Sequence, residues 1–153
     1  MTRLVVPSPV GCLRIEAEGG AIIAVTPTDE APSRSDDRLL NACAAELQAY
    51  FAGRLTNFSV PLAPRGTPFQ QTVWRELGRI PYGGTTTYGA IARAVGKPKA
   101  ARAVGQAVHR NPVAILIPCH RVIGANGFVS GYAWGPGMKA RLLTLEAARR
   151  PNG

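Results

Sequence analysis

One stretch of the sequence reads Asn111-Pro112-Val113-Ala114-Ile115-Leu116-Ile117-Pro118-Cys119-His120-Arg121-Val122. The apolar run 115–117 predicts a short buried strand that ends at the following proline. Cys119 and His120 come next, at the expected end of this strand. A cysteine becomes a nucleophile when a base or a positive environment favours its thiolate. His120 supplies a base and Arg121 adds positive charge, so this stretch is the candidate chemical centre.

A third group is needed to orient the imidazole of the histidine, and a carboxylate is the usual choice. After residue 60 the chain has only two carboxylates, Glu76 and Glu146, and the residues alone leave both open. A free cysteine is most often a small buried hydrophobe, and a Cys-His pair by itself is weak support for catalysis. Cys119 is nevertheless the only cysteine after residue 60, and it stands beside a proline at an expected strand end, which favours a chemical role.

Two short helices are expected just before this centre. The first spans 88–95, with Thr87 as its N-cap and Gly96 as its end, and the second spans about 99–108. The connection Gly96-Lys97-Pro98 is short, which is typical of a helix-turn-helix. An ordinary helical hairpin in a core fits the spacing at least as well. The second helix is mostly alanine and glycine around one long cation, Arg102, so it predicts either a probe inserted into DNA or simply good helix formers.

The N-terminal part predicts an antiparallel meander followed by a helix. Short apolar stretches at 4–6, 11–17 and 21–25 alternate with Gly and Pro residues, and an amphipathic pattern covers 38–51. Pro61 and Pro64-Arg65-Gly66 are typical of a linker, and Thr67 is the expected N-cap of the next helix. The sequence therefore predicts two domains, residues 1–60 and residues 61–153.

Charge divides along the same boundary. Residues 1–60 carry a net charge of −2 and residues 61–153 a net charge of +11. This asymmetry suggests that the second domain meets a polyanion, although an arginine-rich proteome explains it about equally well.

The composition also excludes several classes of protein. No apolar run approaches the length of a membrane span, and the pattern of the first residues does not predict a secretory signal. The three cysteines lack C-x-x-C spacing and only two histidines are present, so a metal site is not expected. We expect reduced thiols in a cytoplasmic protein.

The stretch 111–122 resembles the signature of the O6-alkylguanine-DNA alkyltransferases, the methylated-DNA–protein-cysteine methyltransferases, in which P-C-H-R-V after an apolar run is highly specific. Further similar segments lie at 8–11, 66–74, 80–83, 87–88, 101–105 and 142–146. The resemblance implies an α+β fold. An N-terminal RNase H-like lobe, an antiparallel sheet plus a helix, would precede a winged-helix C-terminal lobe that carries the helix-turn-helix.

The resemblance also implies roles for individual residues. Cys119 matches the acceptor of the alkyl group, His120 the histidine that deprotonates it through a water, and Glu146 the glutamate that holds this histidine. Asn111 matches the asparagine at the hinge before the active-site segment. Tyr88 matches the tyrosine that helps rotate the nucleotide and assists the departure of guanine.

Two further groups of residues follow from the same resemblance. Arg102 matches the arginine that fills the gap in the base stack, and the other expected DNA-binding residues are Tyr88, Ala101, Lys97 and Lys99. The expected substrate pocket consists of Val122, Tyr132, Ala133 and Trp134. The tryptophan stands where many members carry a small residue, so the acceptable size of the alkyl group is left open.

The implied function is direct DNA repair by stoichiometric, irreversible transfer of an alkyl group from O6-alkylguanine to Cys119. The partner would be double-stranded DNA bound through its minor groove by a monomer, with no cofactor and no metal. Three alternatives exist: an alkyltransferase-like protein, which lacks the acceptor cysteine, a helix-turn-helix regulator with an added cysteine cluster, and a hydrolase that turns over repeatedly. Action on O4-alkylthymine, cooperativity on DNA and thermal stability are left open by the sequence.

Overall fold

The computed structural model describes residues 1–125 and 132–148. The contacts between residues divide the chain into two compact units. The first is Met1–Arg65 together with Pro112–Leu116, and the second is Gly66–Asn111 together with the chain from Ile117 onward. Among the described residues no helix is long and apolar enough to cross a membrane.

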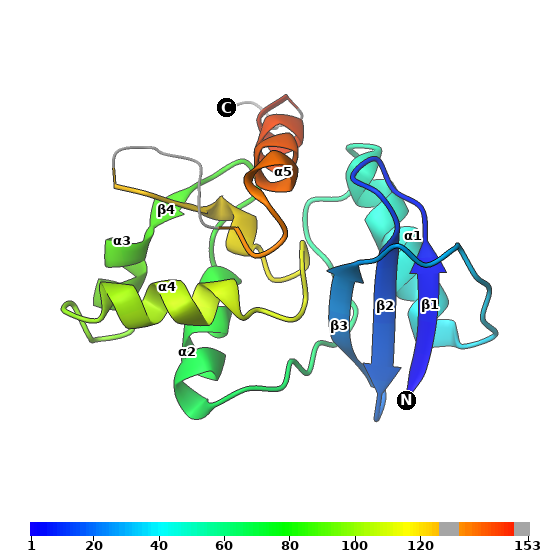
Figure 1. Ribbon diagram of the computed structural model, residues 1–153, viewed down its shortest axis with the longest axis horizontal. Coiled ribbons are helices and arrows are strands. Elements are labelled where there is room, and N and C mark those ends of the chain that lie inside the picture. Colours follow the sequence, from blue (N-terminus) through cyan, green and yellow to red (C-terminus); the bar gives the residue numbers. More distant parts are fainter. Residues whose placement is uncertain (126–131, 149–153) are drawn as a thin grey trace. The chain divides into compact units, whose positions relative to one another are not determined.

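The first unit is a three-stranded antiparallel sheet in the order β1-β2-β3, with one helix against it (Figure 1). Its elements are β1 (Thr2–Val6), β2 (Leu13–Glu18), β3 (Ala21–Pro27) and α1 (Arg38–Phe51). Burial alternates along β2, so one of its faces enters the core. The predicted meander and helix are therefore confirmed.

Helix α1 begins and ends at the residues that the pattern predicts. The Asp37 side chain accepts a hydrogen bond from the Leu40 amide at 2.9 Å, which satisfies one of the free donors of the first turn. The buried face of the helix consists of Leu40, Cys43, Leu47 and Tyr50. Cys43 is thus an apolar core residue of this unit.

The segment 112–116 returns to the first unit and lies along the edge of β3. The Val25 amide donates to the Pro112 carbonyl at 3.0 Å, and the Ala114 amide donates to the Val25 carbonyl at 2.8 Å. The strand predicted at 115–117 is wrong, because the chain turns here instead. Ile115 has a φ of 72°, a positive value that residues in β-strands do not adopt. An apolar run that is buried from all sides does not distinguish a strand from a buried turn.

The second unit is mainly helical, with one short two-stranded parallel sheet. Its elements are α2 (Pro68–Leu77), β4 (Thr86–Thr87), α3 (Tyr88–Ala94), α4 (Ala101–His109), the one-turn 3-10 helix η1 (Cys119–Arg121), β5 (Val122–Ile123) and α5 (Pro136–Ala148). Thr67 is the N-cap of α2, as predicted, and it forms a capping box with Gln70. The Trp74 indole donates to the Ala107 carbonyl at 2.8 Å and so ties α2 to α4.

Helices α3 and α4 pack against each other and form the expected pair of short helices (Figure 1). The Thr87 hydroxyl accepts from the Ala90 amide at 3.1 Å, and Gly96 follows α3 with a φ of 79°, so both predicted boundary signals are present. Val104, Ala107 and Val108 of α4 are buried, whereas Arg102 is exposed. The helix hence presents one face to the core and another to solvent.

Candidate active site

The backbone of η1 fixes the position of Cys119. The Arg121 amide donates to the Pro118 carbonyl at 3.0 Å, and the Cys119 amide donates to the Ile117 carbonyl at 2.7 Å. The Val122 amide donates to the Cys119 carbonyl and ends the turn. Only 2% of Cys119 is exposed, so the thiol lies inside the second unit and a reactant must enter to meet it.

His120 and Glu146 form a buried pair. The Nε2 atom of His120 lies 2.7 Å from Oε2 of Glu146, and the two residues are 0% and 1% exposed. Glu76, the other carboxylate that the sequence leaves open, pairs instead with Arg79 at 3.6 Å. The structure therefore selects Glu146, from α5, as the partner of the histidine.

Glu146 is also bound by Arg121, which the sequence associates only with positive charge near the thiol. Nε of Arg121 donates to Oε1 at 2.8 Å and Nη2 donates to Oε2 at 3.0 Å. The Gly83 amide approaches Oε1 at 3.4 Å. The guanidinium lies over the ring of Tyr82, 5.7 Å from its centroid. The carboxylate is thus held on both oxygens.

The environment keeps His120 neutral. Burial lowers the pKa of the imidazole and outweighs the attraction of Glu146, which acts in the opposite direction. With its Nε2 proton donated to the carboxylate, the lone pair of a neutral ring resides on Nδ1. This Nδ1 atom is buried and has no hydrogen-bond partner among the described residues. The ring is therefore poised to accept a proton at Nδ1.

The resting thiol is protonated. Burial raises the pKa of Cys119 to about 11, although hydrogen bonds from the side chains of Asn111 and Tyr132 and the charge of Lys139 favour the thiolate. Asn111 is itself 2% exposed and donates through Nδ2 to the Ile117 carbonyl at 2.9 Å. It consequently links the end of α4 to the segment that carries the cysteine.

Lys139 belongs to this cluster and was not anticipated from the sequence. It is 1% exposed, and its Nζ atom donates to the Val122 carbonyl at 2.5 Å. A signal for it exists, because Lys139, Leu142 and Glu146 stand three and seven residues apart on one face of α5. Once Glu146 is assigned to the site, this spacing also directs Lys139 toward it.

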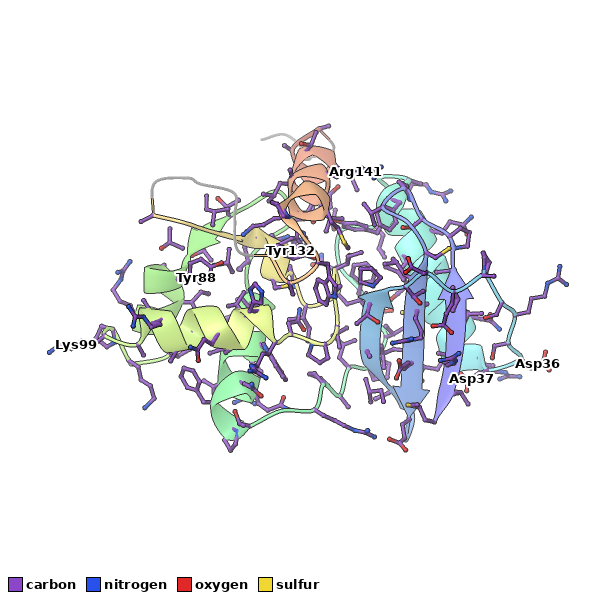
Figure 2. The ribbon with its side chains drawn as sticks, viewed as in Figure 1. Asp36, Asp37, Tyr88, Lys99, Tyr132 and Arg141 are labelled. Carbon is purple, nitrogen blue, oxygen red and sulfur yellow. The ribbon has the colours of Figure 1, made fainter. Side chains whose placement is uncertain are left out.

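Three aromatic side chains belong to the site. Tyr88 and Tyr132 lie near the thiol, and Trp134 packs on Tyr132. Tyr88, the first residue of α3, is half-buried, and both burial and the charge of Cys119 raise the pKa of its phenol. A Cβ atom on Gly105 would lie 3.7 Å from the Tyr88 ring, so α4 passes close to it. Tyr132 is buried, and the Trp134 ring meets it edge to face with centroids 5.2 Å apart. Figure 2 labels Tyr88 and Tyr132.

The remaining expected residues fall into two groups. Val122 is fully buried, whereas Ala133 is exposed. The family resemblance also predicts that Ser130 and Gly131 belong to the loop that covers the pocket, and both lie outside the described residues. Arg102, Lys97 and Lys99 are exposed and Ala101 is partly exposed. Lys99 projects from the turn between α3 and α4 (Figure 2). Across residues 1–125 and 132–148, no group of three or more His, Cys, Asp or Glu side chains could hold a metal ion.

Comparison with known families accounts for both units. The family described as 6-O-methylguanine DNA methyltransferase, ribonuclease-like domain, matches residues 1–64. The family described as 6-O-methylguanine DNA methyltransferase, DNA binding domain, matches residues 68–148. The expected α+β fold, a ribonuclease-like part before a DNA-binding part, is confirmed by these matches together with the antiparallel sheet.

Individual relatives agree with the family match. The chain is 55% identical over 113 residues to a methylated-DNA–protein-cysteine methyltransferase of Methanosarcina acetivorans, covering 74% of this chain and 72% of that one. It is 46% identical over 152 residues to a protein of the same name from Mycobacterium tuberculosis, covering 95% and 92%. A crystal structure of Mycobacterium tuberculosis OGT in complex with DNA superposes with a TM-score of 0.86 at 45% identity, covering 97% and 94%.

Proposed function

This chain belongs to the 6-O-methylguanine DNA methyltransferase family and is a DNA repair methyltransferase, and we propose that Cys119 is the residue that accepts the alkyl group. The observation that carries this assignment is the buried Cys119 followed by His120. The Nε2 atom of His120 is hydrogen-bonded to Glu146, and its Nδ1 atom has no hydrogen-bond partner among the described residues. Cys43 is a core residue of the first unit, and Cys12 lies in the first unit as well.

The transfer begins with removal of the thiol proton. His120 takes this proton at Nδ1 through one water molecule, and Glu146 stabilises the imidazolium that results. The Cys119 sulfur then attacks the alkyl carbon of O6-alkylguanine. A carbon–sulfur bond forms while the bond between that carbon and O6 breaks, and the electron pair of the broken bond stays on the guanine.

Departure of the guanine anion requires hydrogen bonding or protonation. The hydroxyl of Tyr88 donates to the leaving base, and burial keeps this phenol protonated because it raises the pKa. The product is a thioether, which water does not readily hydrolyse. Each protein molecule is therefore used once, and the chemistry needs no cofactor.

A base inside duplex DNA cannot reach a buried thiol, so the nucleotide must rotate out of the stack at a cost of a few kcal/mol. We propose that α4 enters the minor groove and that Arg102 fills the gap in the stack. The exposed face of α4 carries small residues around this arginine, which allows close approach to DNA. Ala101, Lys97 and Lys99 lie at the same end of α4 and would contact the sugar-phosphate backbone of the DNA.

The rotated base would be held by residues that surround the thiol. Main-chain groups near Cys119 and Val122 contact the guanine edge, and Tyr132, Ala133 and Trp134 cover it. The pKa of Cys119 already reflects hydrogen bonding with Tyr132, which supports a position of this tyrosine beside the reacting sulfur. O4-alkylthymine is a smaller candidate substrate for the same pocket.

We further infer that the protein acts as a monomer in the cytoplasm. The three cysteines are free thiols, which suits a reducing compartment. Among the described residues Met1 is the only large hydrophobic side chain that is mostly exposed, which fits a monomer.

Stoichiometry separates this function from that of a Cys-His-Glu hydrolase. Incubation of the protein with excess methylated duplex should stop after one equivalent of methyl groups has been removed. Continued removal beyond one equivalent would contradict the proposed acceptor role of Cys119.

A further inference from the structure

Each of the three guanidinium nitrogens of Arg121 donates a hydrogen bond to an oxygen atom of the protein. Nε and Nη2 bind the two oxygens of Glu146, and Nη1 donates to the Ile80 carbonyl at 2.7 Å. The side chain is 7% exposed. A planar fork that meets a carboxylate on two points fixes both its position and its rotation, which a lysine ammonium does not do.

His120 and Arg121 share the same carboxylate. Oε2 of Glu146 accepts from Nη2 of Arg121 at 3.0 Å and lies 2.7 Å from Nε2 of His120. In a buried site, a carboxylate without a second cation would strongly favour an imidazolium beside it. An imidazolium carries a proton on both nitrogens, so it cannot act as a base. The arginine therefore competes with the histidine for the charge of Glu146.

We propose that Arg121 is a positioning residue of the alkyl transfer, which neutralises and orients Glu146 so that His120 remains a neutral base with its lone pair on Nδ1. This role rests on the proposed function of His120. It gives the adjacent arginine a purpose beyond a general positive environment, because its guanidinium acts on the cysteine through Glu146 and the histidine.

The other charged and titratable groups around His120 act in known directions. Burial and the positive charges of Arg121 and Lys139 lower the pKa of the imidazole, whereas Glu146 raises it. Cys119 on η1 is a neutral thiol at rest, and Tyr88 on α3 is a neutral phenol, because burial raises the pKa of each. Burial, the largest of these effects, would persist in the absence of Arg121, but loss of its charge would remove one of the groups that oppose Glu146. The pKa of His120 would then rise.

The test is the pH dependence of methyl transfer under single-turnover conditions with methylated duplex. Arg121→Met removes the charge and the fork, while Arg121→Lys keeps the charge alone. In Arg121→Met the acid limb of the rate profile should move to higher pH by about one unit. In Arg121→Lys the limb should stay where the wild type has it, with a lower rate at all pH values. Arg79→Met is the matched control, since Arg79 is an exposed arginine paired with a glutamate and should change neither the limb nor the rate.

The outcomes separate this proposal from the function on which it rests. If the wild type transfers no methyl group, the proposed function fails. If the wild type is active and Arg121→Met loses rate equally at every pH, the arginine is merely structural and the proposal is overturned.

Should Arg121→Met not fold, nitrogen NMR of His120 in the wild type and in Arg121→Lys decides. In both proteins we expect the His120 ring to be neutral, with its proton on Nε2, at pH values somewhat below 6.5, the ordinary pKa of histidine. An imidazolium near neutral pH in the wild type contradicts it.

Discussion

The imidazole of His120 and the carboxylate of Glu146 meet at 2.7 Å although 26 positions separate the two residues in the chain. The pair joins η1, which carries the cysteine, to helix α5. Because Nε2 is committed to this contact, only Nδ1 can accept a proton from the thiol. The orientation of the base is consequently set by α5, the last described helix in the chain, which packs against η1.

Burial of Cys119 predicts a thiol that is inert in the absence of DNA. Its pKa is raised to about 11, so near neutral pH almost none of it is thiolate, and the thiol is scarcely exposed. Iodoacetamide should modify the partly exposed Cys12 of the native protein much faster than Cys119. Peptide mass spectrometry measures both rates. Rapid modification of Cys119 at neutral pH would show an open, already ionised site.

Arg102→Ala should slow repair of methylated duplex far more than reaction with free O6-alkylguanine base, because only the duplex substrate requires extrusion. We expect a loss of about tenfold or more on duplex, since about 1.4 kcal/mol of a cost of a few kcal/mol gives that factor. Arg54→Ala removes an exposed arginine from the first unit and serves as the control. Equal slowing of both substrates by Arg102→Ala would indicate a folding defect instead.

Lys97 and Lys99 should contribute to the salt dependence of DNA binding. Each phosphate contact adds about 0.9 to the slope of log affinity against log salt concentration. Substitution of either lysine by glutamine should therefore reduce the slope by about one in fluorescence anisotropy titrations on duplexes of any sequence. Unchanged slopes in both variants would place the α3–α4 turn away from the DNA backbone.

Trp134 is expected to narrow the pocket. Its ring packs edge to face on Tyr132, so it adds bulk next to a residue proposed to cover the base. Reaction with O6-benzylguanine should be slow relative to methylated DNA. Trp134→Gly should speed benzyl transfer severalfold and leave methyl repair nearly unchanged.

The alternative is that Trp134 serves stability alone, by packing against α5 near Met138 and Leu142. Melting temperatures of the wild type and Trp134→Gly, measured beside the labelling rates, distinguish the two roles. A large drop in melting temperature without faster benzyl transfer would rule out the narrowing.

Sequence reasoning succeeded where a local signal fixes the structure. The predicted caps Thr67 and Thr87 bind their own helices, and such short-range chemistry can be read from the residues themselves. The period of apolar residues in α1 predicted its full extent for the same reason. The family resemblance placed Glu146 beside His120, which spacing alone left undecided against Glu76.

The features that were missed depend on long-range packing. The run 115–117 forms a turn, since the segment before it is held by main-chain hydrogen bonds to β3, nearly ninety positions earlier in the chain. The buried contact of Lys139 with the Val122 carbonyl and the fork of Arg121 on Glu146 likewise arise only when α5 packs on η1. Lysine and arginine are ordinarily exposed residues. The spacing of Lys139 from Glu146 points to the site only once Glu146 has been assigned to it, and no local pattern marks Arg121 as buried.

The mass of the intact protein after exposure to methylated duplex DNA tests the central claim most directly. The account predicts that the wild type gains one methyl group in place of the thiol proton, and that peptide mapping locates it on Cys119. Cys119→Ser should gain nothing, because a serine hydroxyl is far less ionised, yet it should still bind DNA, and Cys12→Ser should react like the wild type. A methyl group found on another residue, or gained by Cys119→Ser, would contradict the account.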